Sequence, residues 1–125
     1  MSSPIEFELF DGYVCFRPSG QVTFEEVVAI ISEAIAQAAD KGVKRLVVDI
    51  INLGGFPPPT TADRYFMATE WASNSRGLRL SVVTRPELIA PFRFGILVAR
   101  NRGLLANVFT LEPEAIEWLL QSNPE

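Results

Sequence analysis

The spacing of apolar residues along this chain predicts alternating strands and helices. Two short apolar-rich segments, 6–10 and 13–18, flank Asp11 and Gly12. This dipeptide is typical of a two-residue hairpin turn, so we expect the two segments to pair as antiparallel strands.

The next segment carries the periodicity of an amphipathic helix. Thr23 and Glu26 have the spacing of a capping box, in which each side chain bonds the backbone amide of the other residue, and Gly42 is placed to end the helix. The apolar face consists of Phe24, Val27, Val28, Ile31, Ile35 and Ala38. A helix that begins at Thr23 should therefore follow the hairpin.

A buried strand and a stiff loop come next. Residues 44–50 contain three consecutive apolar residues, as expected of a strand covered on both faces. The segment 51–59 contains two glycines and three consecutive prolines, which a helix or a central strand does not accommodate, so we predict a loop. Thr60 and Asp63 then have capping spacing and predict a second helix that ends at about Ser75.

The remainder of the chain repeats this alternation. Residues 78–84 predict a strand, 89–102 a third helix and 107–110 a short strand, after which Thr110 is placed to cap a last helix. Strands that alternate with helices favour a mostly parallel sheet with right-handed crossovers. We therefore predict a single α/β domain over 1–125. Its five-stranded sheet is parallel apart from an antiparallel edge strand, and the order of elements is β-β-α-β-α-β-α-β-α.

Four segments carry landmarks of a known family. They are VTFEE (22–26), LVVDI (46–50), RFGILVARNRG (93–103) and VFTLEPEAIEWL (108–119). With these segments the chain resembles the STAS domain of bacterial anti-sigma-factor antagonists, and it is similar to a branch of small bacterial proteins related to them. The resemblance covers nearly the whole chain. It implies a superhelical stack of strand–helix units, which is also the fold of CRAL-TRIO lipid-exchange proteins.

The resemblance also implies a regulatory role. In antagonists of this family, a partner kinase phosphorylates a serine or threonine that follows the third strand and its loop, and the phosphate releases the partner. The usual motif there is D-S-x-G, whereas this chain reads P-P-T-T-A. Thr60 and Thr61 are therefore the candidate phosphorylation sites.

Composition narrows the classes of function. The chain has 125 residues, no histidine and a single cysteine, Cys15. It therefore lacks the commonest general base, thiolate zinc sites and the usual partner of serine or cysteine nucleophiles, so we expect no enzyme activity, no metal and no cofactor. Cys15 lies in the middle of a predicted strand, where we expect a small buried apolar side chain.

Charge and hydropathy bear on partners and location. The net charge of −4 gives little attraction for a polyanion, so we do not expect a nucleic-acid partner. No apolar run approaches the length of a membrane span, and the first ten residues lack the basic and apolar regions of a signal peptide. Together with the unpaired cysteine, these features predict a soluble cytoplasmic protein without an integral membrane segment.

One edge of the predicted sheet is the candidate binding site. Ligands of open α/β sheets favour the carboxyl ends of the strands. The residues expected at the ends of the third and fourth strands and at the start of the second helix are Asp49, Asn52, Thr60, Thr61, Thr84 and Arg85. The alternative is structural: the threonines cap the helix and Asp49 bonds loop amides.

The third predicted helix has two apolar faces. One contains Phe92, Ile96 and Ala99, and the other contains Phe94, Leu97 and Val98. One face should pack on the sheet. The second face, Phe94, Leu97 and Val98, is a candidate interface with a neighbouring helix, a second copy of the chain or a lipid. Arginines are frequent in the same region, at Arg76, Arg79, Arg85, Arg93, Arg100 and Arg102, and are consistent with an acidic partner or with structural roles.

Two functions remain open from the sequence. The first is a non-catalytic regulatory domain of the STAS kind, which acts through a protein partner or as a homodimer. The second is a domain that binds a lipid or small apolar ligand, as the CRAL-TRIO-like fold would allow. The aromatic residues Tyr65, Phe66 and Trp71 of the second helix motivate the latter.

Overall fold

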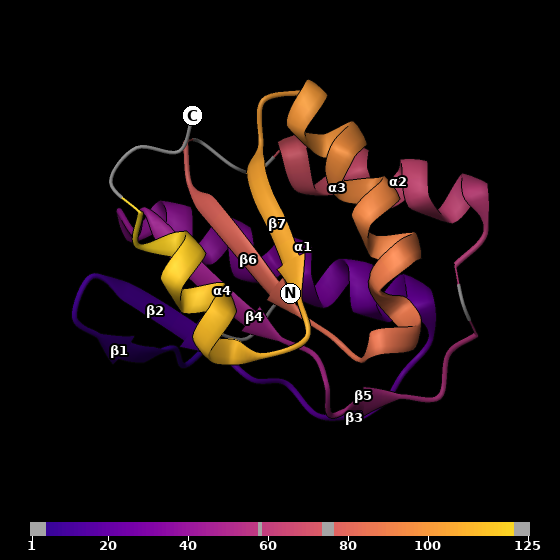
Figure 1. The fold of residues 1–125 in the computed structure, drawn as a ribbon, viewed down its shortest axis with the longest axis horizontal. Coiled ribbons are helices and arrows are strands. Elements are labelled where there is room, and N and C mark those ends of the chain that lie inside the picture. Colours follow the sequence, from indigo (N-terminus) through magenta and orange to yellow (C-terminus); the bar gives the residue numbers. More distant parts are fainter. Residues whose placement is uncertain (1–4, 58, 74–76, 122–125) are drawn as a thin grey trace.

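The main body of the protein is a five-stranded sheet. It is seen in a computed structural model that describes residues 5–57, 59–73 and 77–121 (Figure 1). The strands of this sheet are β1 (Glu8–Phe10), β2 (Tyr13–Phe16), β4 (Arg45–Asp49), β6 (Arg79–Val83) and β7 (Leu105–Phe109). They lie in the order β1-β2-β4-β6-β7, with β1 antiparallel to β2 and all other pairs parallel. The predicted α/β class with an antiparallel edge strand is therefore confirmed.

The helices of the described chain cover the two faces of this sheet unequally. They are α1 (Phe24–Asp40), α2 (Thr61–Ser73), α3 (Ile89–Asn101), which follows the 3-10 turn η1 (Pro86–Leu88), and α4 (Glu112–Leu119). The first three share one large core on one face, whereas α4 packs on the opposite face (Figure 1). The strands β2, β4, β6 and β7 follow one another in space as they do in sequence. Successive right-handed crossovers therefore place α1, α2 and α3 on the same side.

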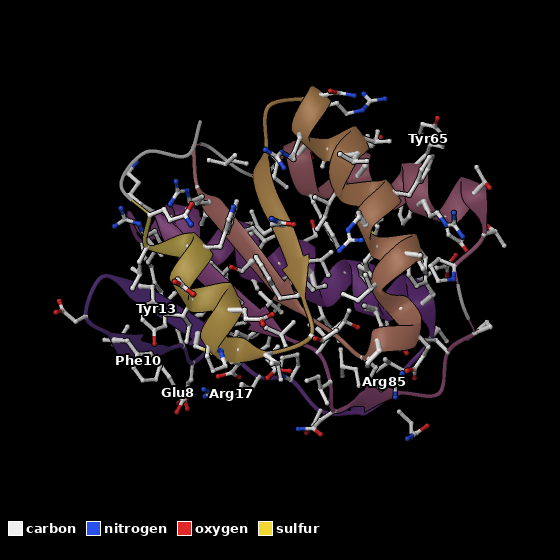
Figure 2. All side chains as sticks on the ribbon, viewed as in Figure 1. Glu8, Phe10, Tyr13, Arg17, Tyr65 and Arg85 are labelled. Carbon is white, nitrogen blue, oxygen red and sulfur yellow. The ribbon has the colours of Figure 1, made fainter. Side chains whose placement is uncertain are left out.

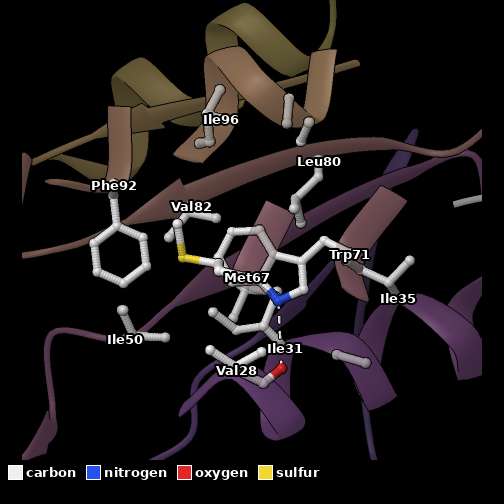
Figure 3. Packing of buried hydrophobic residues seen from close by; sticks show 14 of the residues in the cluster. Val28, Ile31, Ile35, Ile50, Met67, Trp71, Leu80, Val82, Phe92 and Ile96 are labelled. Atoms are coloured by element: carbon white, nitrogen blue, oxygen red, sulfur yellow. Dashed lines mark hydrogen bonds between the residues drawn. The ribbon is translucent and has the colours of Figure 1, made fainter. Parts of the chain in front are cut away.

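The large core is organised around a tryptophan in α2. Trp71 is fully buried, and its ring stacks with Phe92 of α3 at a centroid distance of 6.1 Å. Its indole nitrogen donates to the backbone carbonyl of Val28 in α1 at 3.3 Å, which satisfies a donor that would be costly to bury alone (Figure 3). Gly95 lets α2 and α3 approach closely, because a Cβ at this position would overlap the side chain of Met67.

Two of the predicted helix starts are confirmed as capping boxes. At α1, the Thr23 amide donates to Glu26 Oε1 at 2.8 Å and the Glu26 amide donates to Thr23 Oγ1 at 3.1 Å. At α2, the Thr60 amide donates to Asp63 Oδ2 at 2.9 Å and the Asp63 amide donates to Thr60 Oγ1 at 3.1 Å. Each exchange satisfies two of the amide donors that a helix start leaves unpaired.

The start of the last helix differs from the prediction. The expected cap at Thr110 is wrong: Leu111 occupies the cap position of α4 and makes no side-chain bond there. α4 begins one residue later, with Pro113 in its first turn, where a proline needs no amide partner. The expected end of α2 near Ser75 falls outside the described residues. No helix within the described ranges has the length and apolar character needed to cross a bilayer.

A short second sheet lies within the predicted loop. β5 (Leu53–Gly54) pairs in parallel with β3 (Gly20–Gln21), and the Gly20 amide donates to the carbonyl of Asn52 at 3.1 Å. Each strand has two residues, so neither carries a periodicity that the sequence could reveal. The pairing ties the segment after β2 to the segment after β4 and closes one end of the core.

Candidate functional site

Four of the predicted binding residues lie along the carboxyl edge of the main sheet, in separate environments. Asp49 ends β4, and Asn52 is an exposed residue of the loop that follows. Thr84 and Arg85 follow β6. Thr84 is fully buried, and its hydroxyl has no hydrogen-bond partner among the described residues. The guanidinium of Arg85 lies over the ring of Phe56, 5.9 Å from its centroid.

The other two predicted residues begin α2. Thr60 is exposed and caps the helix, as the structural alternative expects. Thr61 is the first residue of α2 and is also exposed. The Thr60 hydroxyl accepts a hydrogen bond from the amide of Asp63. The exposed hydroxyl of Thr61 is therefore the more accessible of the two to a modifying enzyme.

The six predicted residues form no hydrogen bond or ion pair with one another, and the topology explains this. A ligand crevice in an open α/β sheet forms where the strand order reverses and the crossover helices leave on opposite faces. Here the parallel strands β2, β4, β6 and β7 run across the sheet in one direction. The helices that connect these strands, α1, α2 and α3, all lie on one face, so no such reversal separates the strands.

The structure places a cluster of charged side chains at the same edge, which the sequence pattern does not predict. Arg17, just after β2, donates to Glu112, the first residue of α4, with Nε–Oε2 at 2.7 Å and Nη2–Oε1 at 2.9 Å. Arg17 also pairs with Glu8 of β1. Asp49 hydrogen-bonds to Glu112 and accepts the Ile51 amide at 3.0 Å. Glu8 and Arg17 lie next to each other near the start of α4, whereas Arg85 lies apart along the same edge (Figure 2).

The two carboxyl groups of this cluster have opposite pKa shifts. Burial, followed by the hydrogen bond to Glu112, raises the pKa of Asp49 to about 6. The hydrogen bonds from Arg17 and then from Asp49 lower the pKa of Glu112 to about 2. Below about pH 6 the two carboxyl groups hold one proton between them, and Asp49 carries it. We call Arg17, Asp49 and Glu112 the acid clasp.

Split carboxyl pKa values also occur in acid–base catalysis, but the surroundings of the acid clasp favour a structural role. Arg17 is already bonded to two carboxylates. Cys15 is almost completely buried, and burial raises the pKa of its thiol to about 12, so it is a poor nucleophile. Within the described ranges, no three His, Cys, Asp or Glu side chains are grouped to hold a metal ion. What the acid clasp can do is hold a proton and anchor α4.

Further polar contacts hold α4 from the interior strand β6. Arg79 donates to the backbone carbonyl of Leu119 and, at 2.7 Å, to that of Gln121, and its guanidinium lies 5.3 Å from the ring centroid of Trp118. Ser81 donates to the carbonyl of Ala115 at 2.9 Å. Arg79 therefore has a structural role at a helix end, where a cation also offsets the helix dipole.

Some signals for these contacts were present in the sequence. Glu112 precedes Pro113 at the start of the last helix, and acidic residues are favoured in a first helical turn. An arginine inside an apolar strand, as at Arg79, indicates a buried cation that needs acceptors. Neither signal identifies the partner residue. Arg17 lies 95 residues from Glu112, and Leu119 lies 40 residues from Arg79.

Large apolar side chains are exposed on both α2 and α3. Tyr65 and Phe66 are each 48% exposed and Leu97 is 55% exposed. Phe94 is half-buried, with its ring edge-to-face against Tyr65 at 5.5 Å. We call these four residues the α2–α3 surface. Of the predicted interface, Leu97 is thus exposed and Phe94 is partly covered, whereas Val98 packs against the large core. The exposed arginines on this helix and just after it are Arg93, Arg100 and Arg102.

A groove of about 550 Å³ lies on the opposite end of the sheet, beside β1. Its lining is mainly apolar, and the charged residues Glu6 and Lys41 also line it; the apolar residues are Ile5, Phe7, Leu9, Val14 and Val43. The Lys41 ammonium lies 5.4 Å from the centre of the Phe7 ring. This size is within the range of small-molecule sites in proteins, roughly 300–1,000 Å³.

Comparison of the sequence with protein-family models and with curated proteins, and of the fold with solved structures, gave no match.

Proposed function

We propose that this protein is a non-catalytic regulatory domain that binds a protein partner through the α2–α3 surface, in the cytoplasm. The observation that carries the proposal is the exposure of three large apolar side chains, Tyr65, Phe66 and Leu97, on two adjacent helices. Large apolar groups that are exposed together are characteristic of interaction sites, and aromatic anchors contribute most to protein interfaces.

Charge supports an acidic partner for this surface. Leu97 lies between Arg93 and Arg100 on the exposed side of α3, in a chain whose net charge is −4. Residues three and four apart share a helix face, so both guanidinium groups flank the same apolar contact. Arginine at the rim of an interface favours a partner with carboxylates and speeds the encounter.

The start of α2 provides a means of regulation that agrees with the resemblance to STAS domains. Thr61 is exposed and lies one helical turn before Tyr65, hence on the same side of α2. A phosphate on Thr61 would place about two negative charges beside the α2–α3 surface and repel an acidic partner. Thr60 is the less suitable acceptor because its hydroxyl caps the helix.

The test uses two leucines of equal exposure. Leu97→Glu places a charge within the α2–α3 surface, and Leu111→Glu places the same charge at a residue that is 56% exposed in the cap position of α4. Proteins cross-linked to tagged wild type in its host cell should be retained by Leu111→Glu and lost by Leu97→Glu and Thr61→Glu. Equal cross-linking by the two leucine variants, or none by wild type, contradicts the proposal.

The groove beside β1 favours a second candidate function, the binding of an amphipathic carboxylate such as a fatty acid. Phe7, Leu9 and Val43 offer an apolar lining, and Lys41 offers a cation for the carboxylate. Native mass spectrometry with palmitate should show a 1:1 complex that Lys41→Glu weakens. The absence of a complex at palmitate concentrations of tens of micromolar rejects this candidate.

A further inference from the structure

The two edges of the main sheet differ in their outward backbone groups. β7 ends the sheet on one side and β1 ends it on the other. On β7, the carbonyl of Phe109 accepts the Thr84 amide and so faces the β6 side, which leaves the neighbouring Val108 amide to face outward. The side chain of Asn107 accepts that outward amide at 2.9 Å. An outward donor of the β7 edge is therefore already occupied by the chain itself.

The edge of β1 is open at Leu9. Leu9 lies opposite Val14, one pair away from Phe10 and Tyr13, which flank the two-residue turn. Hydrogen-bonded and non-hydrogen-bonded pairs alternate along an antiparallel ladder, and the pair that closes a two-residue turn is hydrogen-bonded. The amide and the carbonyl of Leu9 therefore point away from β2. Within the part of the chain that the structure describes, no strand pairs with β1 on that side.

The apolar groove follows this open edge on the face of the sheet that α1 covers. Leu9 shares that face with Val14, its partner across the hairpin, which belongs to the large core. Phe7 and Leu9 are two residues apart, both line the groove, and Leu9 is 80% exposed. A strand that paired with β1 would place every second side chain opposite Phe7 and Leu9, over the groove. Such a strand would cover Leu9 and also bond its backbone groups.

The β1 segment is acidic. Glu6, Glu8 and Asp11 are all exposed. Arg17 pairs with Glu8, but Glu112 shares the same guanidinium. Opposite charges stabilise cross-strand pairs and like charges destabilise them. A partner strand with basic residues between its apolar residues therefore complements this edge.

A second copy of the chain complements the β1 edge poorly. Two copies related by a two-fold axis would pair their β1 strands antiparallel. If Leu9 lies opposite Phe7 of the other copy, the two Glu8 residues oppose each other. If the two Leu9 residues oppose each other, the apolar Phe7 lies against the charged Asp11. Neither register places a cation opposite the acidic residues.

We propose that β1 accepts an extended segment of a partner protein as a further strand of the main sheet, in which apolar residues that face the groove alternate with basic residues. Backbone hydrogen bonds to Leu9 supply affinity, whereas the groove and the acidic side chains select the sequence. This edge is separate from the α2–α3 surface, so the inference goes beyond the function proposed for that surface and each can be tested without the other.

The test titrates the intact protein into fluorescein-labelled peptides and follows fluorescence anisotropy. A short peptide of alternating valine and lysine should bind wild type at protein concentrations up to about 1 mM. The same peptide with glutamate in place of lysine should bind at least about tenfold more weakly. N-methylation of the valine amides, which would face Leu9, should abolish binding, whereas N-methylation of the lysine amides should not. Absence of binding, or equal affinity within either pair of peptides, overturns the proposal.

Variants of the protein locate the binding edge. Glu6→Lys should weaken binding of the lysine peptide about three- to tenfold, whereas Glu25→Lys, which makes the same change at an exposed residue in the first turn of α1, should not. Leu9→Pro should abolish binding, because it removes the outward amide and no donor of the β1–β2 ladder. Equal affinities of Glu6→Lys and Glu25→Lys contradict the proposal, as does retained binding by Leu9→Pro.

Two further variants separate this edge from the functions proposed above. Leu97→Glu lies on the α2–α3 surface and should leave peptide affinity unchanged. Lys41→Glu should weaken palmitate binding but not the binding of the lysine peptide, because it removes a cation from the groove that receives the peptide. Loss of peptide binding in Leu97→Glu would place the peptide on the α2–α3 surface, and its loss in Lys41→Glu would exclude a basic occupant of the groove. Either loss overturns the proposal.

Hydrogen exchange gives a second measurement that needs no variant. Addition of the lysine peptide should slow exchange of the Leu9 amide at least about fivefold and leave the outward Ala106 amide of β7 unchanged. Slower exchange at Ala106 instead of Leu9 would place the peptide on the wrong edge. Protection of Leu9 that rises with protein concentration in the absence of peptide would identify a second copy as the occupant. Both results overturn the proposal.

Discussion

The guanidinium of Arg79, the first residue of β6, donates to the backbone carbonyl of Leu119 at the last residue of α4. This contact joins an interior strand to a helix end that has no basic residue of its own in its last turn. It also explains why a charged side chain occurs in a strand that is buried throughout. Burial lowers the pKa of Arg79, so its hydrogen bonds to the α4 carbonyls are what make the buried cation tolerable.

Arg79→Met should destabilise the protein by about 2–4 kcal/mol, because the buried carbonyl of Leu119 and the partly buried carbonyl of Gln121 lose a charged donor while the apolar stem is kept. Arg45 lies beside Arg79 in register on β4 and provides the control. Arg45→Met should change the free energy of unfolding by less than about 0.5 kcal/mol, since the side chain is only half-buried. Urea denaturation of both variants checks this, and equal losses would contradict the assigned role of Arg79.

Stability should pass through a maximum near pH 4. Glu112 has a lowered folded pKa, so its contribution is present above its ordinary value of 4.5 and is lost as the pH falls toward 2. Asp49 has a raised folded pKa, so its contribution is present below 3.8 and is lost as the pH rises through 6. Urea denaturation at pH 2.5 to 8 should show this maximum in wild type.

In Asp49→Asn, the loss of stability at pH values above the wild-type maximum should disappear. The side-chain amide cannot ionise, and it still donates a hydrogen bond to Glu112. The variant should therefore be more stable than wild type at pH 7.5 and should retain the decline below pH 4.5. A variant that is less stable at pH 7.5, with an unchanged pH profile, would show that Asp49 does not titrate in this range.

Gly95→Ala should destabilise the protein by about 1–3 kcal/mol, although alanine is the better helix former. The added Cβ would overlap the end of the Met67 side chain and would lie 3.4 Å from the Arg64 carbonyl. In a Met67→Leu background the same substitution should cost less, because leucine lacks the terminal methyl group of methionine. Thermal unfolding of the four chains of this double-mutant cycle measures the coupling, and additive effects would exclude the Met67 contact as the cause.

Thr60 and Thr61 are adjacent at the start of α2, and substitutions of each test a structural role and a regulatory role separately. Thr60→Ala removes the cap and should lower the free energy of unfolding by about 1 kcal/mol. Thr61→Ala should leave stability within about 0.5 kcal/mol of wild type, since its side chain is exposed. Denaturation curves of both variants test this, and a large loss from Thr61→Ala would argue that Thr61 also holds the helix.

The sequence alone predicted the features that depend on near neighbours. The Asp11–Gly12 hairpin, the capping boxes at Thr23 and Thr60, and the burial of Cys15 all follow from residues within a few positions of one another. The α/β class follows from the alternation of strand and helix periodicity along the chain.

Only the tertiary structure decided which distant residues meet. The pairing of β3 with β5, the contact of Arg17 with Glu112 and that of Arg79 with Leu119 each join segments far apart in the chain. Such contacts depend on strand order and on the face to which each helix returns, and neither leaves a local pattern. For the same reason, the sequence predicted the position of Asp49 at the carboxyl edge of the sheet, because that position depends on its own strand. Only the structure shows that α4 brings a second carboxyl group, that of Glu112, beside Asp49.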